Sequence, residues 1–240
     1  MANSFYVAGE KRADKVNDLF AQVAPRYDLI NDLQSFGLHR AWKRRVVRMA
    51  NVKPGDRALD VCCGTGDIAF ALAKAGAEVN GVDFSEPMLG VARQRSGNTP
   101  RSALRVPHFH QGDAQRLDFP DTTFDVVTVG YGLRNLSSWE AGLREMYRVA
   151  RPGGRLLVLD FGKPDNGWWR ALYFAYLRCV VPVFGRLFCG DSATHAYILE
   201  SLQHYPAQRG VAEAMQRLGC RDVRIVNLIG GAMSINFGVK

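Results

Sequence analysis

The sequence Leu59-Asp-Val-Cys-Cys-Gly-Thr-Gly-Asp67 is the most informative part of the chain. A short apolar run over 58–61 leads into it, and apolar residues at helical spacing follow it over 68–74. This order predicts a strand, a glycine-rich turn and a helix. Because Gly64 and Gly66 have no Cβ, a ligand can approach the backbone of this turn closely.

A carboxylate at the end of the next predicted strand indicates what that ligand contains. Asp83 follows the strand pattern over 78–82, and a carboxylate there can accept hydrogen bonds from a ribose diol. The spacing Gly64-x-Gly66-x-x-Ala69 also satisfies the loose dinucleotide fingerprint. The turn therefore predicts a nucleotide-type site, and taken alone it leaves three interpretations open: NAD, S-adenosylmethionine, or a tight turn without a ligand.

Three features favour S-adenosylmethionine over NAD. Asp60 ends the first strand, where its carboxylate can meet the cationic end of S-adenosylmethionine but would repel a pyrophosphate. Asp113 and Ala114 follow the third strand, where a carboxylate and an adjacent backbone N–H can bind adenine. Asp113 can also be read as a cap on the following turn, but carboxylates at three successive strand ends argue against that reading. The third feature is the end of the chain.

Strand and helix patterns alternate from residue 58 onwards, which predicts an α/β fold with a doubly wound, mostly parallel sheet. The expected strands are 58–61, 78–82, 107–111, 125–129 and 155–160, the last after a turn at 151–154, and the expected helices are 66–75, 86–96 and 138–150. A helix over 211–218 and two runs separated by Gly230-Gly231, 222–229 and 232–239, then predict an antiparallel hairpin. A seven-stranded sheet finished in this way is typical of class I S-adenosylmethionine-dependent methyltransferases.

The remaining segments are predicted to be helical. Residues 10–24 form an amphipathic pattern, and 27–50 contain two further helical pieces joined near Ser35-Phe-Gly37. We expect one domain, in which 1–50 form a helical cap, 51–165 the cofactor-binding core, 166–208 a helical lid (with a helical insertion near 167–205), and 209–240 the final helix and hairpin. The apolar face of 167–190 fits a site for a lipid tail, a packed lid or a homodimer interface.

Composition restricts the function classes. The chain has 240 residues, 47% hydrophobic and 22% charged, as expected for a globular protein with one large domain. No signal peptide is visible, and five cysteines without paired spacing suit a reduced, cytoplasmic protein without a metal site at Cys62 and Cys63. The net charge of +8 is spread out and lacks an RNA-binding pattern. It favours transient peripheral contact with the inner face of a membrane over nucleic acid.

Several separated motifs together resemble the ubiquinone/menaquinone biosynthesis C-methyltransferase family. They are Tyr27-Asp-Leu-Ile-Asn31 with Ser35 and His39-Arg-Ala-Trp42, Gly132-Leu-Arg-Asn135, Arg148-Val-Ala-Arg-Pro-Gly-Gly-Arg-Leu-Leu-Val-Leu-Asp160 and Glu200-Ser-Leu-Gln-His-Tyr-Pro206. The resemblance covers essentially the whole chain. It implies transfer of the sulfonium methyl group of S-adenosylmethionine to a ring carbon of a polyprenylated quinol.

The resemblance also assigns site residues. Thr65, Asp83, Asp113 and Ala114 fall on cofactor-binding positions, and the predicted cofactor set is completed by Asp60, Gly64, Gly66, Phe84 and Gly130. One departure is visible, because Cys62 stands where the family usually has the first glycine of its loop. Cys62-Cys63-Gly64 and Gly130-Tyr131-Gly132 look most like the branch that methylates naphthoquinols, such as demethylmenaquinol. The benzoquinol precursor of ubiquinone and another lipophilic small molecule are the alternatives.

The catalytic candidates are Tyr27, Arg134 and Asn135. The acceptor has to be the reduced quinol, because its hydroxyl groups donate electron density to the ring carbon. Arg134 is suited to stabilise a developing phenolate and to orient a water, Asn135 to hold that water, and Tyr27 to bind a quinol oxygen. Two rival functions are an NAD-dependent oxidoreductase, for which a second catalytic domain is missing, and a non-catalytic S-adenosylmethionine-binding regulator.

Overall fold

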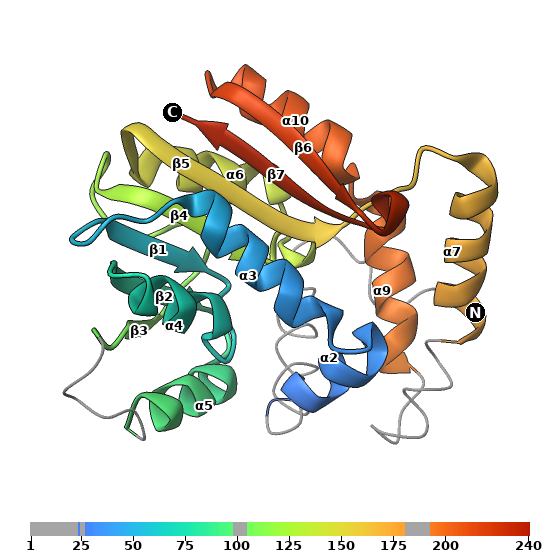
Figure 1. Cartoon of the computed structure of the whole chain (residues 1–240), viewed down its shortest axis with the longest axis horizontal. Helices are drawn as coiled ribbons and strands as arrows, with labels where there is room; N and C mark the ends of the chain where they lie inside the picture. Colours follow the sequence, from blue (N-terminus) through green and yellow to red (C-terminus); the bar gives the residue numbers. More distant parts are fainter. Residues whose placement is uncertain (1–23, 25–26, 98–104, 181–192) are drawn as a thin grey trace.

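A mixed seven-stranded sheet forms the centre of the computed structural model, which describes residues 24, 27–97, 105–180 and 193–240 (Figure 1). The strands lie in the order β3-β2-β1-β4-β5-β7-β6. Neighbours among β1 to β5 pair in parallel, whereas β7 is antiparallel to both β5 and β6. The bounds are β1 Arg57–Val61, β2 Glu78–Asp83, β3 His108–Gln111, β4 Phe124–Gly130, β5 Ala150–Phe161, β6 Arg221–Leu228 and β7 Met233–Val239. The predicted sheet and its terminal hairpin are confirmed.

Strand β5 is longer than the sequence predicts. The expected turn at 151–154 is an irregularity inside the strand, since Phe124 pairs with Ala150 and the register resumes at Val126 and Arg155. Gly153 has a φ of 78°, a conformation that glycine adopts readily. Its N–H donates to the carbonyl of Lys240 over 2.8 Å. A partner at the other end of the chain therefore holds this segment in the sheet.

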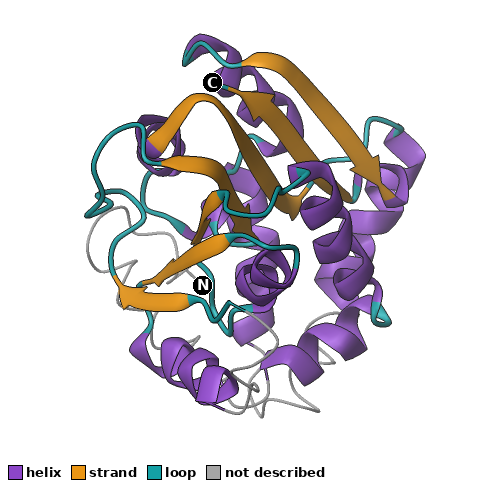
Figure 2. Cartoon of the chain, turned by 60° about the vertical axis from the view of Figure 1, so that its left-hand side comes forward, coloured by secondary structure: helices purple, strands orange, loops and turns teal. Residues whose placement is uncertain are grey.

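Helices cover both faces of the sheet (Figure 2). On one face, α3 (Leu38–Ala50) and α4 (Asp67–Lys74) bury residues such as Val46 and Leu72 in a cluster with Leu157 of β5. On the other face, α6 (Trp139–Val149) and α10 (Ala207–Arg217) bury Leu143 and Met215 in a second cluster. Helix α5 (Glu86–Gly97) contacts β2 and β3. The core thus consists of two apolar layers separated by the sheet.

Local sequence explains where several helices begin. The Ser138 hydroxyl accepts a hydrogen bond from the N–H of Ala141 at the start of α6. The Asn166 side chain does the same for Trp169 in α7 (Gly167–Cys179). Both are side-chain N-caps, which satisfy backbone donors that the first helical turn leaves without partners.

Three further helices lie beyond the carboxyl ends of β4 and β5 (Figure 1). They are α2 (Tyr27–Ser35), α7 and α9 (Ala193–His204). Helices α2 and α3 meet at Phe36 and Gly37, both with positive φ, so the two predicted pieces of the cap and their junction are confirmed. Short 3₁₀ turns, η2 (Leu133–Asn135) and η3 (Ile229–Gly231), complete the elements. The predicted helix at 10–24 falls almost entirely outside the described residues, and so does the part of the apolar segment 167–190 from residue 181 onwards.

Candidate active site

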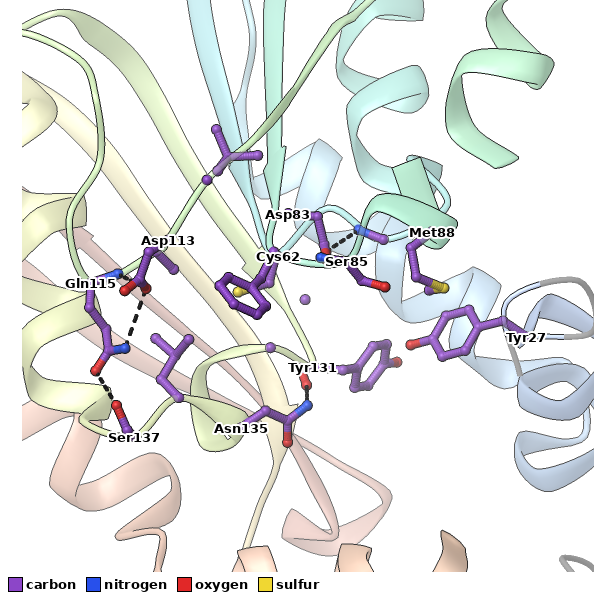
Figure 3. Close-up of a pocket in the computed structure, with 18 residues that line it drawn as sticks. Tyr27, Cys62, Asp83, Ser85, Met88, Asp113, Gln115, Tyr131, Asn135 and Ser137 are labelled. Carbon is purple, nitrogen blue, oxygen red and sulfur yellow. Dashed lines mark hydrogen bonds between the residues drawn. The ribbon is translucent and has the colours of Figure 1, made fainter. Parts of the chain in front are cut away.

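A cleft opens at the carboxyl ends of β1, β2 and β4, and its walls come from several distant parts of the chain (Figure 3). Asp83, Ser85 and Met88 lie on one side of the cleft, whereas Asp113, Gln115 and Ser137 lie on the other. The cleft encloses about 840 Å³ of space, part of it open to solvent. This volume is in the range of sites for small ligands and cofactors.

The glycine-rich turn after β1 forms the floor of the cleft. Cys62, Gly64 and Gly66 all have positive φ, with values of 52°, 54° and 87°. At Gly66 a Cβ would lie 2.8 Å from the ring of Phe109, so this glycine is needed for packing as well as for its backbone conformation. The backbone between β1 and α4 is thereby turned sharply, and Gly64 faces the cleft.

Asp83 ties this turn to the end of β2. One carboxylate oxygen accepts a hydrogen bond from the N–H of Gly64 over 2.8 Å, and the other accepts one from Ser85 over 2.9 Å. Burial raises the pKa of the Asp83 carboxyl, although these backbone donors act in the opposite direction. Each carboxylate oxygen keeps a second lone pair, so Asp83 can still accept hydrogen bonds from a ribose.

Asp113 lies at the rim of the cleft, in the loop after β3. Its carboxylate accepts a hydrogen bond from the backbone N–H of Gln115 over 2.8 Å. The Gln115 side chain in turn accepts hydrogen bonds from the Ser137 hydroxyl and the N–H of Ser138, at 2.7 and 2.9 Å. Beside this exposed network the side chain of Ala114 is buried. Polar groups at the rim thus adjoin an apolar wall, as the binding of a purine ring requires.

A smaller pocket adjoins the cleft and has a strongly polar lining that includes Lys43, Asp60, Thr65 and Asp67. The Asp67 carboxylate pairs with Lys43 of α3 and Arg95 of α5, each at 2.8 Å. Burial acts to raise its pKa, but the two cations outweigh burial and hold the pKa near 2. Asp67 therefore stays ionised and joins three helices at the mouth of this pocket.

Asp60 is the most deeply buried carboxylate in this pocket. It is 1% exposed and accepts hydrogen bonds from the Thr128 hydroxyl over 2.7 Å and the N–H of Ala69 over 3.1 Å. Burial raises its pKa to about 7, against the lowering effect of the Thr128 bond. A cationic ligand group would favour the ionised form.

The structure brings most of the predicted site residues together. The cleft is lined by Tyr27, Gly64, Asp83, Phe84, Asp113, Ala114, Gly130 and Asn135, and the small pocket by Asp60 and Thr65 as well. Gly66 belongs to neither lining. Arg134 lies behind the cleft, since its buried guanidinium pairs with Asp160 at 3.2 Å and donates to the Ser201 hydroxyl over 3.2 Å. A hydrogen bond to the side chain of Asn135 connects it to the cleft lining.

Sequence reasoning missed several of the residues that line these pockets, including Lys43, Ser85, Met88, Gln115 and Ser137. Asp67 belongs to the motif Leu59–Asp67, but the sequence pattern assigns no role to it. Its position at the start of the helix after the glycine turn was a usable signal, because an acidic residue is favoured there. Lys43 lay in a run of basic residues that gave no reason to single it out.

These pockets fit S-adenosylmethionine by the chemistry of their donors and acceptors. The cleft offers carboxylate acceptors at Asp83 and Asp113, as a ribose and an adenine require. The small pocket offers Asp60 to an ammonium group and Lys43 to a carboxylate. Within the described residues, no cluster of three or more His, Cys, Asp or Glu side chains is arranged to hold a metal ion. Fold and site together define a class I S-adenosylmethionine-dependent methyltransferase.

The chain belongs to the ubiE/COQ5 methyltransferase family, whose model matches residues 7–240. It is 42% identical over 237 residues to the ubiquinone/menaquinone biosynthesis C-methyltransferase UbiE of Stenotrophomonas maltophilia, covering 98% of this chain and 93% of the relative. It is 38% identical over 234 residues to a demethylmenaquinone methyltransferase of Listeria monocytogenes, covering 96% and 98%. The family expected from the motifs is confirmed, and the protein is an S-adenosylmethionine-dependent methyltransferase.

Solved structures agree on the fold. A magnesium protoporphyrin IX methyltransferase from Synechocystis, crystallised with bound SAH, superposes with a TM-score of 0.68 at 21% identity, over 95% of this chain and 99% of the other. A SAM-dependent methyltransferase from Aquifex aeolicus superposes with a TM-score of 0.58 at 21% identity, over 82% of this chain and 88% of the other. At such identities the similarity concerns the architecture alone.

Proposed function

We propose that the protein methylates a ring carbon of a polyprenylated demethylmenaquinol to give menaquinol. The observation that carries this proposal is the full-length similarity to demethylmenaquinone methyltransferases, which spans both the cofactor cleft and the helices around it. The similarity to the Stenotrophomonas relative supports a second acceptor, the benzoquinol precursor of ubiquinone.

When bound, S-adenosylmethionine supplies an electrophilic methyl group, and its transfer to the ring leaves S-adenosylhomocysteine and one proton from the ring carbon. The protein's task is therefore to hold the two reactants in line, exclude water and accept that proton. Asp83 and the Asp113–Ala114 segment would hold the nucleoside half of the cofactor. The side chains of Tyr27 and Asn135 line the same cleft, where they would face the acceptor.

Asn135 is oriented from two sides. Its amide oxygen accepts a hydrogen bond from Arg134, and its amide nitrogen donates one to the carbonyl of Tyr131 over 3.1 Å. A side-chain amide has both donors and acceptor lone pairs, so a group held in this orientation at the cleft suits a quinol oxygen or a water that carries the proton away. We assign Asn135 and Tyr27 to contacts with the acceptor.

Arg134 acts from behind Asn135. Its backbone N–H and its guanidinium both bind the Asp160 carboxylate. The guanidinium also stacks on Phe161, with its central carbon 4.7 Å from the centre of the ring. The hydrogen bond to Ser201 adds helix α9 to this arrangement. The charge of Arg134 therefore stabilises a developing phenolate through the Asn135 amide, and the same residue fixes the position of that amide.

The acceptor is tested by incubating the purified protein with labelled S-adenosylmethionine and reduced short-tail quinols. We expect ring-methylated product from demethylnaphthoquinol, and none from the oxidised quinone, whose ring is electron-poor. Product from the benzoquinol alone would replace the first acceptor by the second. If neither quinol is methylated while S-adenosylhomocysteine still binds, the proposed acceptor class is wrong.

We further propose that the protein collects its lipophilic acceptor at an anionic membrane surface. None of the described helices is long and apolar enough to cross a membrane. Large apolar side chains are nevertheless exposed around α2 and along α7, with Phe36 82% and Trp168 90% exposed. The Tyr176 hydroxyl donates to the carbonyl of Gln34 over 3.5 Å, which joins these two helices. Exposed arginines follow on α3, namely Arg40, Arg44, Arg45 and Arg48.

This mixture of apolar and basic side chains suits an interface of anionic phospholipids. We expect the protein to float with anionic vesicles at low salt and to be released at high salt, whereas neutral vesicles should bind it less. Phe36→Ser/Trp168→Ser should abolish flotation, and Ile225→Ser, at an exposed apolar position on β6, serves as the matched control. No flotation of the wild type at low salt would refute the proposal, and loss of a dimer in the double variant would assign the surface to a second copy.

A further inference from the structure

The cleft and the small pocket share one wall, formed by Tyr27, Cys62, Gly64, Gly130 and Tyr131. The cleft carries the groups that suit a nucleoside, and the small pocket carries the charges that suit the amino and carboxylate groups of an amino acid. In S-adenosylmethionine the sulfonium centre joins these two halves. The shared wall is therefore where this chain's residues meet the sulfonium and its methyl group.

Tyr131 stands out in that wall because its hydroxyl has no hydrogen-bond partner in the part of the chain that the structure describes. Among the described residues, the Tyr131 oxygen is buried and neither donates nor accepts a hydrogen bond. A buried polar group without a partner costs free energy, so such a group in a native protein calls for an explanation. Figure 3 shows the hydroxyl groups of Tyr131 and Tyr27 directed toward one another across the cleft.

The backbone of Tyr131 is also in an uncommon conformation. Its φ is +63°, which places a bulky residue in the left-handed region. The N–H of Tyr131 donates to the carbonyl of Leu159 over 2.7 Å, and the Asn135 side chain donates to its carbonyl over 3.1 Å. The surrounding structure thus holds a strained residue in place, and its ring is directed to the shared wall.

The ring has a cationic and an aromatic neighbour. The Nζ of Lys43 lies 5.9 Å from its centre, and Phe161 packs against it with ring centres 6.2 Å apart. Burial raises the pKa of the Tyr131 phenol well above its ordinary value, so the oxygen remains a neutral acceptor with available lone pairs. A neutral oxygen binds a polarised C–H group without attacking it as a phenolate would.

We propose that Tyr131 is a further catalytic residue, whose phenol oxygen accepts C–H···O hydrogen bonds from the sulfonium methyl group. The positive sulfur polarises these C–H bonds, which makes them stronger donors than ordinary methyl groups. The contact satisfies the orphaned oxygen and fixes the direction in which the methyl group points. S-adenosylhomocysteine has neither the methyl group nor the charge, so the contact distinguishes the two ligands. This inference rests on cofactor binding and is independent of which quinol accepts the methyl group.

The test compares the two ligands by calorimetry in the wild type and in Tyr131→Phe, which removes only the oxygen. We expect the Kd for S-adenosylmethionine to rise about two- to fivefold, the equivalent of a C–H···O contact, and the Kd for S-adenosylhomocysteine to stay unchanged. Tyr205→Phe is the matched control, because the Tyr205 hydroxyl is also buried without a partner among the described residues, and Tyr205 lines neither pocket. It should leave both Kd values unchanged.

A second measurement follows the bound methyl group directly. With S-adenosylmethionine carrying ¹³C in the methyl group, the methyl proton resonance of the wild-type complex should move downfield on binding, as C–H···O contacts cause, and this shift should be smaller in Tyr131→Phe. Equal losses of affinity for both ligands would make Tyr131 a structural residue only. Unchanged affinity for S-adenosylmethionine, or no downfield shift, would overturn the proposal.

Discussion

Gly132→Ala should damage the cofactor cleft through a single methyl group. A Cβ at Gly132 would collide with the Cβ of Cys62 and would lie 2.8 Å from its Sγ and 3.3 Å from Cγ2 of Val129. Carbon atoms in proteins pack about 3.5–4.0 Å apart, so the end of β4 and the loop after β1 would have to separate. Both segments line the cleft. The expected damage is therefore local to the ligand site.

The size of the effect follows from this overlap. Overpacking a rigid site typically costs about 1–3 kcal/mol, and Cys62 has little freedom to yield because its own φ is 52°. Binding has to restore the displaced loop, so the Kd for S-adenosylhomocysteine should rise roughly ten- to hundredfold, since 1.4 kcal/mol corresponds to a factor of ten. Cys62→Gly removes the two tightest contacts and also relieves a side chain in a left-handed conformation.

Calorimetry with S-adenosylhomocysteine and thermal unfolding measure these effects. The double variant Cys62→Gly/Gly132→Ala should bind within about threefold of the wild type, because the remaining contact with Val129 is mild. Gly90→Ala is the control: it lies in α5 with nothing within 4 Å of its added Cβ, and its stability should rise by about 0.5–1 kcal/mol. Normal binding by Gly132→Ala, or no rescue in the double variant, would refute the steric argument.

Three further predictions concern charged groups. Asp83→Asn loses a charged acceptor for the N–H of Gly64 and for a ribose, so affinity for S-adenosylhomocysteine should fall by about 1.5–3 kcal/mol in calorimetry; an unchanged Kd would contradict this. The pKa of Asp60 is raised from its ordinary 3.8 to about 7, so the carboxyl is protonated at lower pH. Affinity for S-adenosylmethionine should therefore rise as the pH increases through 7, and Asp60→Asn should lack this rise in a calorimetric pH series. Arg134→Met leaves the Asp160 carboxylate buried without its partner, so the free energy of unfolding should fall by about 3–5 kcal/mol, with much of the loss recovered in Arg134→Met/Asp160→Leu. Turnover should be lost in both Arg134 variants. If the double variant is destabilised as much as Arg134→Met alone, the broken ion pair is not the cause of the loss.

The sequence was sufficient to predict the sheet and the acidic side of the site. Short apolar runs alternate with helical patterns, and the carboxyl ends of parallel strands meet at one edge. Asp60 and Asp83 therefore had to approach the same turn. The hydrogen bond from the Gly64 N–H to Asp83 agrees with this expectation, which required no knowledge of the helices.

Other features depended on contacts between distant segments. The position of Lys43 beside Asp67, 24 residues away, results from the way α3 crosses α4, which no local pattern specifies. The direction of the Arg134 side chain depends on Asp160 and Ser201, which are brought to it by β5 and α9. No local pattern predicts that Gly153 and Gly154 belong to β5, because their hydrogen-bond partner is Lys240, far away in the sequence.

Cys62 places a thiol in the wall that separates the two pockets, next to where an alkylating cofactor binds. A thiolate there would compete with the quinol for the methyl group, and its own methylation would inactivate the enzyme. Burial, reinforced by the negative charges of Asp83 and Asp60, raises the pKa of the Cys62 thiol well above its ordinary value. The thiolate is the nucleophilic form of cysteine. Burial, together with these two carboxylates, therefore protects the protein from being methylated by its own cofactor.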